Sequence, residues 1–358
     1  MTRSDETPGG SGAPDDLDRL LAGIEAKASP LRAVVEEVHR RHVGCTDGRV
    51  ADYIPELAAA DPAHFGLAIT AVDGQSFTAG NTDIAFTIQS VTKPFTYGLA
   101  LEDNGLEVVL DRVGVEPSGD AFNAIELDPR TNRPFNPMVN AGAIATTDLV
   151  KGPDLVARTK RVNAMLARYA GRTLNIDQSV MLSEQATSHR NRAMALLMQS
   201  AGAVSDRVEE SLDLYTGQCS MLVDARDLSV MAATLANGGV NPLTGEQALD
   251  PRYVKHVLGV MYTCGMYDHA GAWSVRVGLP AKSGVAGGLL AVVPGRLGIG
   301  AYSPALDEAG NSVRGALAIE ELSERLGLHL LEPHPSDMVT ELRRPRRISE
   351  PGRNTTSD

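Results

Sequence analysis

The chain has 358 residues, of which 43% are hydrophobic and 22% charged, proportions that are typical of a soluble globular protein with a sizeable core. Its formal net charge of −12 argues against nucleic acids and anionic membranes as partners, because both bind basic patches. No apolar run reaches the roughly 18 residues of a membrane helix, no secretory signal opens the sequence, and the only cysteines are Cys45, Cys219 and Cys264, so we expect a reduced, cytoplasmic protein.

The N-terminal part of the chain contains signals for helices and one hairpin. Residues 1–14 are rich in Gly, Ser, Pro and Thr and are predicted to be disordered, and apolar residues at helical spacing predict a helix over 17–24. Ser29-Pro30 is a typical helix start, followed by apolar residues at the same spacing. Residues 65–80 contain two strand-like runs around Asp73-Gly74 and predict a hairpin. A helix of roughly ten to fourteen residues is predicted to begin close to Ser90.

The remainder of the chain is first helical and then rich in strands. Between about 110 and 260, helical segments alternate with Pro/Gly/Asn loops, and one of these helices is framed by Asp224 as N-cap and by Asn237-Gly238-Gly239 as its end. A last helix is predicted over 312–328, before a polar tail. Strands are predicted for three sequences: AWSVRVGL (272–279), AGGLLAVVP (286–294) and RLGIGAYSP (296–304).

This order predicts a discontinuous α/β (α+β) architecture. Residues 15–110 and 255–332 would form a sheet-containing domain, into which an all-helical domain of residues 111–254 is inserted. Residues 333–358 are expected to be a mostly disordered tail. Small-molecule sites usually form in the cleft between two such parts.

Ser90 and Lys93 form a Ser-x-x-Lys motif at the start of the predicted helix. Residues three apart share one helix face, so the Lys93 amine can reach the Ser90 hydroxyl and activate it as a nucleophile if burial keeps the amine neutral. Pro94 lacks an N–H and is tolerated only in the first turn, which places Ser90 at the helix N-terminus. The chain has only six lysines, and about 0.3 such motifs are expected by chance. Taken alone, the pair can equally be an ordinary surface contact.

A second lysine supports the catalytic interpretation. Lys282-Ser283-Gly284 stands just before a predicted strand, and Ser-x-x-Lys, Ser-Asp-Asn and Lys-Thr-Gly are the three signature elements of serine β-lactamases and penicillin-binding proteins. The second element is missing from this chain. Because an export signal is missing too, a β-lactam or cell-wall substrate is disfavoured, and the acyl-transfer groups are expected to act on another amide.

Three polar residues suggest a small substrate with both an amine and a carboxylate. Asn140 stands at a predicted helix start beside small residues, and Glu184 and Asn191 are seven apart, which predicts one shared helix face. A carboxylate and amides can hold an ammonium and a carboxylate. Each of the three residues can also be a helix cap or a solvated polar side chain.

Nine segments in this order resemble the glutaminase family of the serine β-lactamase-like fold, across residues 49 to about 302. The resemblance implies a β-lactamase/transpeptidase-like fold with an antiparallel sheet flanked by helices. It also implies hydrolysis of L-glutamine to L-glutamate and ammonia without metal or organic cofactor, and a homo-oligomer, dimer or tetramer. The segments are GRVADYIPELA, FTIQSVTKPF, LALEDNG, VGVEPSGDAFNAIE, NPMVNAGAI, SEQATSHRNRAMA, YTGQCS, CGMYDHAG and KSGVAGG.

The resemblance also implies roles for individual residues. Ser90 is similar to the family nucleophile, Lys93 to its base, and Tyr267 to a tyrosine that relays a proton to departing ammonia. Val285 matches the residue whose backbone N–H joins that of Ser90 in an oxyanion hole. For Lys282, electrostatic support of the site and a structural role both stay open. Together with Ser90, Tyr267 and Val285, the positions that match substrate-binding residues are Tyr53, Asn140, Glu184, Asn191 and Tyr215.

Several other interpretations are weaker. His39 and His42 have metal-ligand spacing but no third ligand group, so no metal site is predicted. Cys219 and Cys264 lack an evident base and are expected to be small buried residues. A penicillin-recognising hydrolase and an amino-acid sensor without catalysis are the alternative functions. The missing Ser-Asp-Asn element disfavours the first, and the intact Ser90, Lys93 and Tyr267 disfavour the second.

Overall fold

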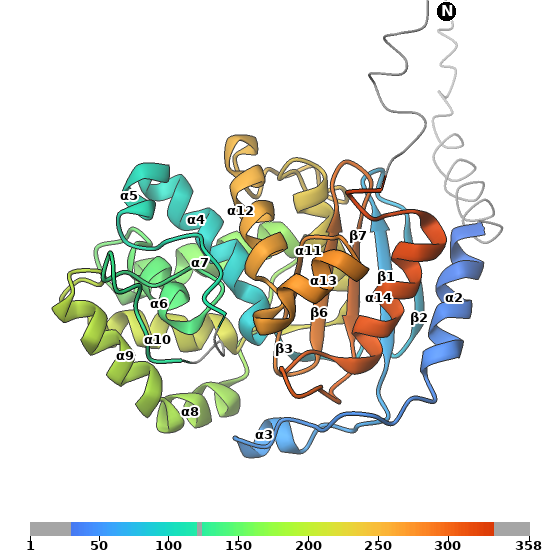
Figure 1. The fold of residues 1–358 in the computed structure, drawn as a ribbon, viewed down its shortest axis with the longest axis horizontal. Coiled ribbons are helices and arrows are strands. Elements are labelled where there is room, and N and C mark those ends of the chain that lie inside the picture. Colours follow the sequence, from blue (N-terminus) through green and yellow to red (C-terminus); the bar gives the residue numbers. More distant parts are fainter. Residues whose placement is uncertain (1–29, 120–123, 333–358) are drawn as a thin grey trace, which may run out of the picture.

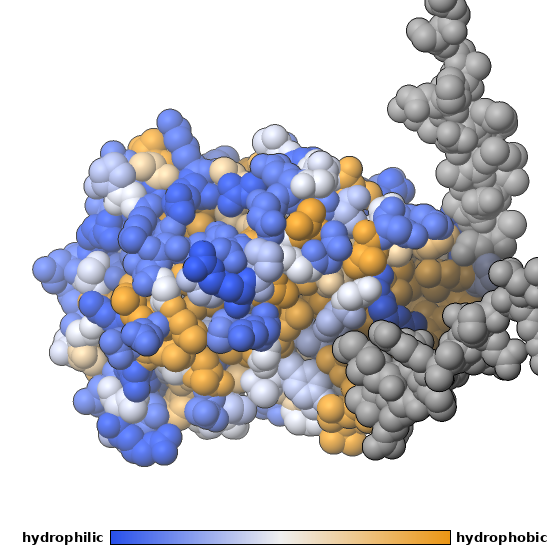
Figure 2. All heavy atoms as spheres, turned by 90° about the horizontal axis from the view of Figure 1, so that it is seen from above, coloured by the Kyte–Doolittle hydropathy of each residue, from blue (hydrophilic) through white to orange (hydrophobic). Residues whose placement is uncertain are grey.

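The computed structural model describes residues 30–119 and 124–332. The predicted helix over 17–24 and both terminal tails lie outside these residues. Among the described residues, no helix is long and apolar enough to cross a membrane. Figure 2 shows polar side chains over much of one face of the molecule, with apolar side chains interspersed between them.

A five-stranded antiparallel sheet joins the two ends of the described chain. Its strand order is β2-β1-β7-β6-β5, so β1 from the beginning of the chain pairs directly with β7 from its end. The predicted antiparallel sheet and hairpin are confirmed, with Gly74 in the turn at φ 89°. The strands are β1 Gly66–Ala71, β2 Ser76–Gly80, β5 Ala281–Ser283, β6 Gly288–Val293 and β7 Leu297–Tyr302.

Helices cover both faces of this sheet (Figure 1). On one face lie α2 (Pro30–His42) and α14 (Val313–Leu326), two of the predicted helices. On the other lies α11 (Ala225–Ala236), whose predicted N-cap Asp224 forms a capping box: its side chain accepts from the Asp227 N–H, and its own backbone N–H donates to the Asp227 carboxylate. A Cβ at Gly298 of β7 would stand 2.1 Å from the Ala233 backbone nitrogen of α11. Glycine is therefore what allows α11 to approach the sheet closely.

The remaining helices gather beside the sheet, on the left of Figure 1. One two-stranded ladder, β3 (Phe86–Thr87) with β4 (Leu222–Val223), ties the segment before Ser90 to this part. The division into domains at 110/111 and 254/255 stays a prediction. The elements are α3 Pro55–Ala58, η1 Gln89–Thr92, α4 Lys93–Asn104, α5 Leu106–Leu110, α6 Asn140–Asp148, α7 Leu155–Ala170, α8 Gln178–Thr187, α9 His189–Ser200, α10 Val208–Cys219, α12 Pro251–Cys264 and η2 Tyr267–His269.

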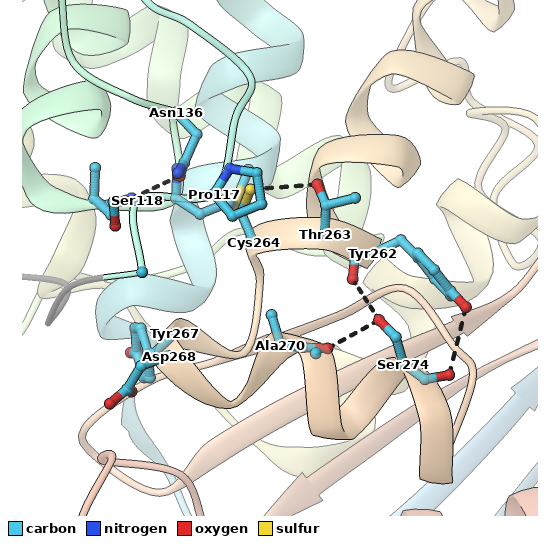
Figure 3. Close-up of a pocket in the computed structure, with 14 residues that line it drawn as sticks. Pro117, Ser118, Asn136, Tyr262, Thr263, Cys264, Tyr267, Asp268, Ala270 and Ser274 are labelled. Carbon is cyan, nitrogen blue, oxygen red and sulfur yellow. Dashed lines mark hydrogen bonds between the residues drawn. The ribbon is translucent and has the colours of Figure 1, made fainter. Parts of the chain in front are cut away.

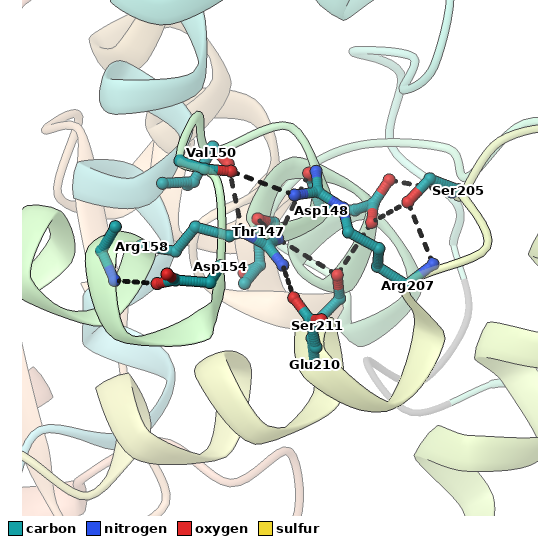
Figure 4. A network of polar contacts seen from close by, with 11 residues as sticks. Thr147, Asp148, Val150, Asp154, Arg158, Ser205, Arg207, Glu210 and Ser211 are labelled. Atoms are coloured by element: carbon teal, nitrogen blue, oxygen red, sulfur yellow. Dashed lines mark hydrogen bonds and ion pairs between the residues drawn. The ribbon is translucent and has the colours of Figure 1, made fainter.

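A buried arginine fixes the end of α6 to its neighbours (Figure 4). Arg158 of α7 is fully buried and donates to the backbone carbonyls of Thr147 and Val150, at 2.9 and 3.1 Å. It also donates to the Ser211 hydroxyl of α10, which in turn donates to Asp148. The carbonyl groups that end α6 are thereby satisfied by a guanidinium rather than by water. Since α6 begins at Asn140, this network holds a helix that carries a predicted site residue.

The strand predicted over 272–279 is wrong, because this segment contains α13 (Ala270–Arg276). Alternate apolar residues at 273, 275 and 277 indicated a strand. Val275, however, is 80% exposed, whereas Ala270, Trp273 and Val277 are buried against the sheet. The buried residues thus have helical spacing, and the apolar Val275 misled the interpretation.

Candidate active site

A cavity of about 360 Å³ lies where the helical elements meet the segment after β5. Its volume suits a small molecule, and its walls combine carboxylate, amide, hydroxyl and phenol groups. The cavity collects every residue predicted from the sequence to bind substrate except Tyr267. Its lining residues are Tyr53, Gln89, Ser90, Asn140, Glu184, Thr187, Ser188, Arg190, Asn191, Tyr215, Thr216, Cys219 and Val285.

Ser90 lies in the short 3₁₀ turn η1, immediately before α4. The predicted start of the helix is confirmed, since Pro94 occupies the first turn of α4. Gln89, directly before Ser90, has a left-handed backbone with φ 50°. That conformation is rare outside glycine and is concentrated at functional sites. It redirects the chain immediately before Ser90.

The loop after β5 reaches the Ser90 backbone. A Cβ placed on Gly284 would lie 3.0 Å from the Ile88 carbonyl oxygen and 3.5 Å from the Ser90 nitrogen. A side chain at this position would crowd the Ile88 carbonyl oxygen, so glycine favours the close approach. Val285, the next residue, lines the same cavity as Ser90. The arrangement brings the two peptide segments expected to supply an oxyanion hole to one place.

Lys93 points directly at the Ser90 hydroxyl. Its Nζ lies 3.0 Å from Ser90 Oγ and 2.7 Å from Asn140 Oδ1. The side chain is fully buried, and burial lowers the pKa of Lys93 to about 8. An amine with this pKa is partly neutral near pH 7, so it can act as a base toward the serine hydroxyl.

Asn140 links the reactive pair to the rest of the cavity. Its Oδ1 accepts from Lys93 and, at 3.2 Å, from the Tyr215 hydroxyl, while its Nδ2 donates to Asn191 Oδ1 at 3.1 Å. Asn140 begins α6, as predicted. Burial raises the pKa of Tyr215 well above its ordinary value, so this phenol stays a neutral hydrogen-bond donor.

Glu184 supplies the negative charge of the cavity. It accepts hydrogen bonds from the Tyr53 hydroxyl at 2.6 Å and from Gln89 Nε2 at 3.2 Å. Burial raises the pKa of Glu184, while the two hydrogen bonds act in the opposite direction. The prediction that Glu184 and Asn191 share one helix is wrong: α8 ends at Thr187 and α9 starts at His189. Both residues still line the cavity, because the two helices meet at this break.

Tyr267 approaches the reactive groups from the side of the second lysine. Its hydroxyl donates to the Ser283 carbonyl at 2.9 Å. Burial raises the pKa of Tyr267, and a hydrogen bond with Ser90 opposes the shift. Its backbone is left-handed, with φ 57°. Tyr267 also borders a second cavity of about 320 Å³, together with Asn136 and Cys264 (Figure 3).

Lys282 is fully buried on β5 beneath Tyr267. Its Nζ donates to the Ser283 carbonyl at 2.6 Å and lies 4.0 Å from the centroid of the Tyr267 ring. Burial, reinforced by the positive charge of Lys93, lowers the pKa of Lys282 well below its ordinary value. Lys282 and Lys93 are thus two buried amines that lie close enough for their charges to interact.

The sequence reasoning did not place six of the lining residues in the site: Gln89, Thr187, Ser188, Arg190, Thr216 and Cys219. Gln89 stands beside the motif, and only its position before Ser90 could have indicated a role. Cys219 was predicted to be small and buried, which is confirmed, but its place in the cavity was not foreseen. Burial raises the pKa of its thiol to about 12, so Cys219 stays neutral. Cys264 is buried as well.

The two histidines with metal-ligand spacing have separate partners. His39 stacks on Phe65 and lies 3.0 Å from its carbonyl oxygen, whereas His42 lies 2.7 Å from Glu321. Within residues 30–119 and 124–332, no group of three His, Cys, Asp or Glu side chains is arranged to hold a metal ion.

Comparisons with known proteins extend this description. The family model described as Glutaminase matches residues 48–331. A glutaminase from Nostoc sp. (strain PCC 7120) is 56% identical over 309 residues, which are 86% of this chain and 92% of the relative. A glutaminase from Microcystis aeruginosa is 57% identical over 318 residues, 89% and 94% of the two chains.

Solved structures agree with the sequence comparisons. The structure of the probable glutaminase ybaS superposes with a TM-score of 0.83 at 41% identity, covering 85% of this chain and 98% of the other. The crystal structure of Mglu in its glutamate form has a TM-score of 0.82 at 45% identity, with 86% and 71% covered. These matches extend over the sheet, the surrounding helices and the cavity alike, and this chain therefore belongs to the glutaminase family and has its β-lactamase-like fold.

Proposed function

We propose that this chain hydrolyses L-glutamine to L-glutamate and ammonia through an acyl-enzyme formed on Ser90. The observation that carries the proposal is the contact of 3.0 Å between the buried Lys93 amine and Ser90 Oγ. A serine hydroxyl becomes a nucleophile when a base of suitable pKa lies within hydrogen-bond distance, and Lys93 meets both conditions.

The cavity suits the two charged ends of glutamine. Glu184 is the carboxylate that would bind the α-ammonium group, held in place by Tyr53 and Gln89. The amide of Asn191 and the hydroxyl of Tyr215 are neutral donors for the α-carboxylate. With both ends bound, the side-chain amide extends toward Ser90, and this orientation supplies much of the rate enhancement.

In the acylation step, Lys93 accepts the proton of Ser90 as Oγ attacks the amide carbon. The C–N bond then breaks, and the nitrogen leaves as ammonia with the proton held by Lys93, which the Tyr267 hydroxyl relays to it. The negative charge of the tetrahedral intermediate is stabilised by the backbone N–H groups of Ser90 and Val285. Removal of one such donor typically costs about 2.7–4 kcal/mol of barrier.

In the second step, water replaces ammonia. Lys93 removes a proton from the water, which attacks the acyl carbon and releases glutamate while Ser90 recovers its proton. The proposed reaction uses no metal or organic cofactor. We also expect a homo-oligomer that is located in the cytoplasm. Light scattering can measure the number of subunits in the assembly.

The proposal is tested by measuring ammonia release from glutamine and from asparagine with the wild type and with Ser90→Ala. We expect turnover of glutamine by the wild type and its loss in Ser90→Ala. Intact-protein mass spectrometry after rapid quenching should show a glutamyl adduct on the wild type alone. Ammonia release by Ser90→Ala at the wild-type rate would contradict the acyl-enzyme. Faster turnover of a chromogenic β-lactam than of glutamine would contradict the substrate.

A further inference from the structure

We infer that Lys282 is a positioning residue for Tyr267, which it clamps from two directions so that the phenol stays aligned with Ser90. The inference rests on the proposed function, because it assigns Tyr267 the proton relay of that reaction. Lys282 itself contacts neither the nucleophile nor the main cavity, and its effect on turnover would pass through the tyrosine.

The first contact is a shared carbonyl group. The Ser283 oxygen accepts from Lys282 Nζ at 2.6 Å and from the Tyr267 hydroxyl at 2.9 Å. A carbonyl oxygen has two lone pairs, so two donors satisfy it completely. Both donors are buried. If one donor is removed, the other is free to rotate around the oxygen, and the direction of the phenol is no longer fixed.

The second contact is made with the face of the ring. Lys282 Nζ lies 4.0 Å from the Tyr267 ring centroid, a distance at which an N–H group of the amine contacts the aromatic face whether the amine is charged or neutral. The amine contacts the face of the ring, whereas the carbonyl oxygen accepts the hydrogen bond of the hydroxyl. Together the two contacts restrict both the rotation and the tilt of the Tyr267 ring. Tyr267 needs such support, since it lies in the three-residue turn η2 with a left-handed backbone.

The strand explains why Lys282 faces the tyrosine. In the ladder, Lys282 of β5 is opposite Leu290 of β6, and opposite residues project to the same face of a sheet. Leu290 packs in the core between the sheet and α11, so Lys282 projects to that face of the sheet as well. A lysine in such a core is unusual, because burial of a charge is costly. An apolar residue of similar length would fill this space without that cost.

The charges around Lys282 fit the same role. The groups that act on it are Lys93, which is also buried, and the neutral thiol of Cys219. Repulsion between the two amines disfavours a charge on both. Burial, the larger cause of the lowered pKa of Lys282, disfavours its charge in either state of Lys93. When Lys93 is charged, a neutral Lys282 amine still donates an N–H to the Ser283 carbonyl.

The test is a double-mutant cycle on the full chain with Lys282→Met and Tyr267→Phe. Methionine keeps the length of the apolar stem and removes the donors. We expect Lys282→Met to lower kcat/KM by about 10²-fold, as a misaligned group does. In the Tyr267→Phe background the same change should lower it by no more than about threefold, because no phenol is left to position. Lys282→Gln, which restores one N–H donor, should recover part of the loss.

Two controls separate positioning from damage to the fold. In the Ser90→Ala background, calorimetry should give Lys282→Met an unchanged dissociation constant for glutamine, within about twofold. Lys255→Met, on the exposed face of α12, should leave turnover unchanged.

Two outcomes would overturn the role. The first is that the fold-losses of kcat/KM in the two single mutants multiply in the double mutant, which would show that the two residues act independently. The second is that both Lys282 variants lose the circular dichroism spectrum of the wild type. If the wild type itself releases no ammonia, the proposed function fails instead, and the two failures are thus distinguishable.

Discussion

The clearest quantitative prediction concerns the pH dependence of turnover. Only the neutral amine of Lys93 can accept the Ser90 proton, and burial lowers the pKa of Lys93 to about 8. A lowered lysine pKa means that the active, neutral form increases as pH rises. With this pKa, about one eleventh of the molecules hold a neutral Lys93 at pH 7 and half of them at pH 8. We therefore expect kcat/KM to rise about fivefold from pH 7 to pH 8 and to fall about tenfold per pH unit below pH 7.

The assay is ammonia release at low glutamine concentration between about pH 6 and pH 8.5, where the thiol of Cys219 stays protonated. The dissociation constant of glutamine for Ser90→Ala, measured by calorimetry over the same range, serves as the control. This dissociation constant should change little with pH, because the rise of kcat/KM reflects the deprotonation of the base and not the binding of glutamine. Two results would refute the assignment of Lys93 as the base: a kcat/KM that does not change over this pH range, or a dissociation constant that has the same pH dependence as kcat/KM.

Three further predictions concern single side chains. Glu184→Gln keeps the shape of the cavity but removes its carboxylate, so KM for glutamine should rise about tenfold or more in initial-rate measurements, and an unchanged KM would exclude Glu184 as the ammonium ligand. Gly298→Ala places a methyl group against the Ala233 nitrogen and should lower the free energy of unfolding in urea by about 1–3 kcal/mol. Its control, Gly259→Ala on the exposed surface of α12, meets nothing within 4 Å and should raise that free energy by about 0.5–1 kcal/mol. Arg158→Met removes the guanidinium from three carbonyl groups at the end of α6, of which only that of Thr147 keeps a backbone donor, and should cost about 2–6 kcal/mol in the same titration; a loss below about 1 kcal/mol would show that water replaces the guanidinium.

Local signals in the sequence predicted the geometry around Ser90 well. The spacing of Ser90 and Lys93 fixes their shared helix face, and Pro94 fixes where that helix starts. Both follow from the geometry of one turn, without information from distant parts of the chain. The same holds for Asp224, whose cap depends only on the three residues that follow it.

Signals that depend on tertiary packing were less reliable. The segment around Trp273 alternates as a strand does, and only its position against the sheet shows which residues are buried. The helix break at Ser188 likewise has no proline or glycine to announce it. Gln89 is identified as a site residue only by its hydrogen bond to Glu184, which the packing of α8 places beside it. These contacts join residues far apart in the chain, which a local pattern does not encode.

The left-handed residues of the site carry a consequence for attempts to stabilise the protein. In the described part of the chain, three residues other than glycine have positive φ, and two of them, Gln89 and Tyr267, flank the reactive groups. Each such conformation costs about 1–2 kcal/mol, which glycine would not incur. A screen that scores only the melting temperature would therefore favour glycine at both positions. The molecules it selects would be more stable and would have lost the side chains that touch Glu184 and Ser90, so thermal stability and turnover are opposed at these two points of the backbone.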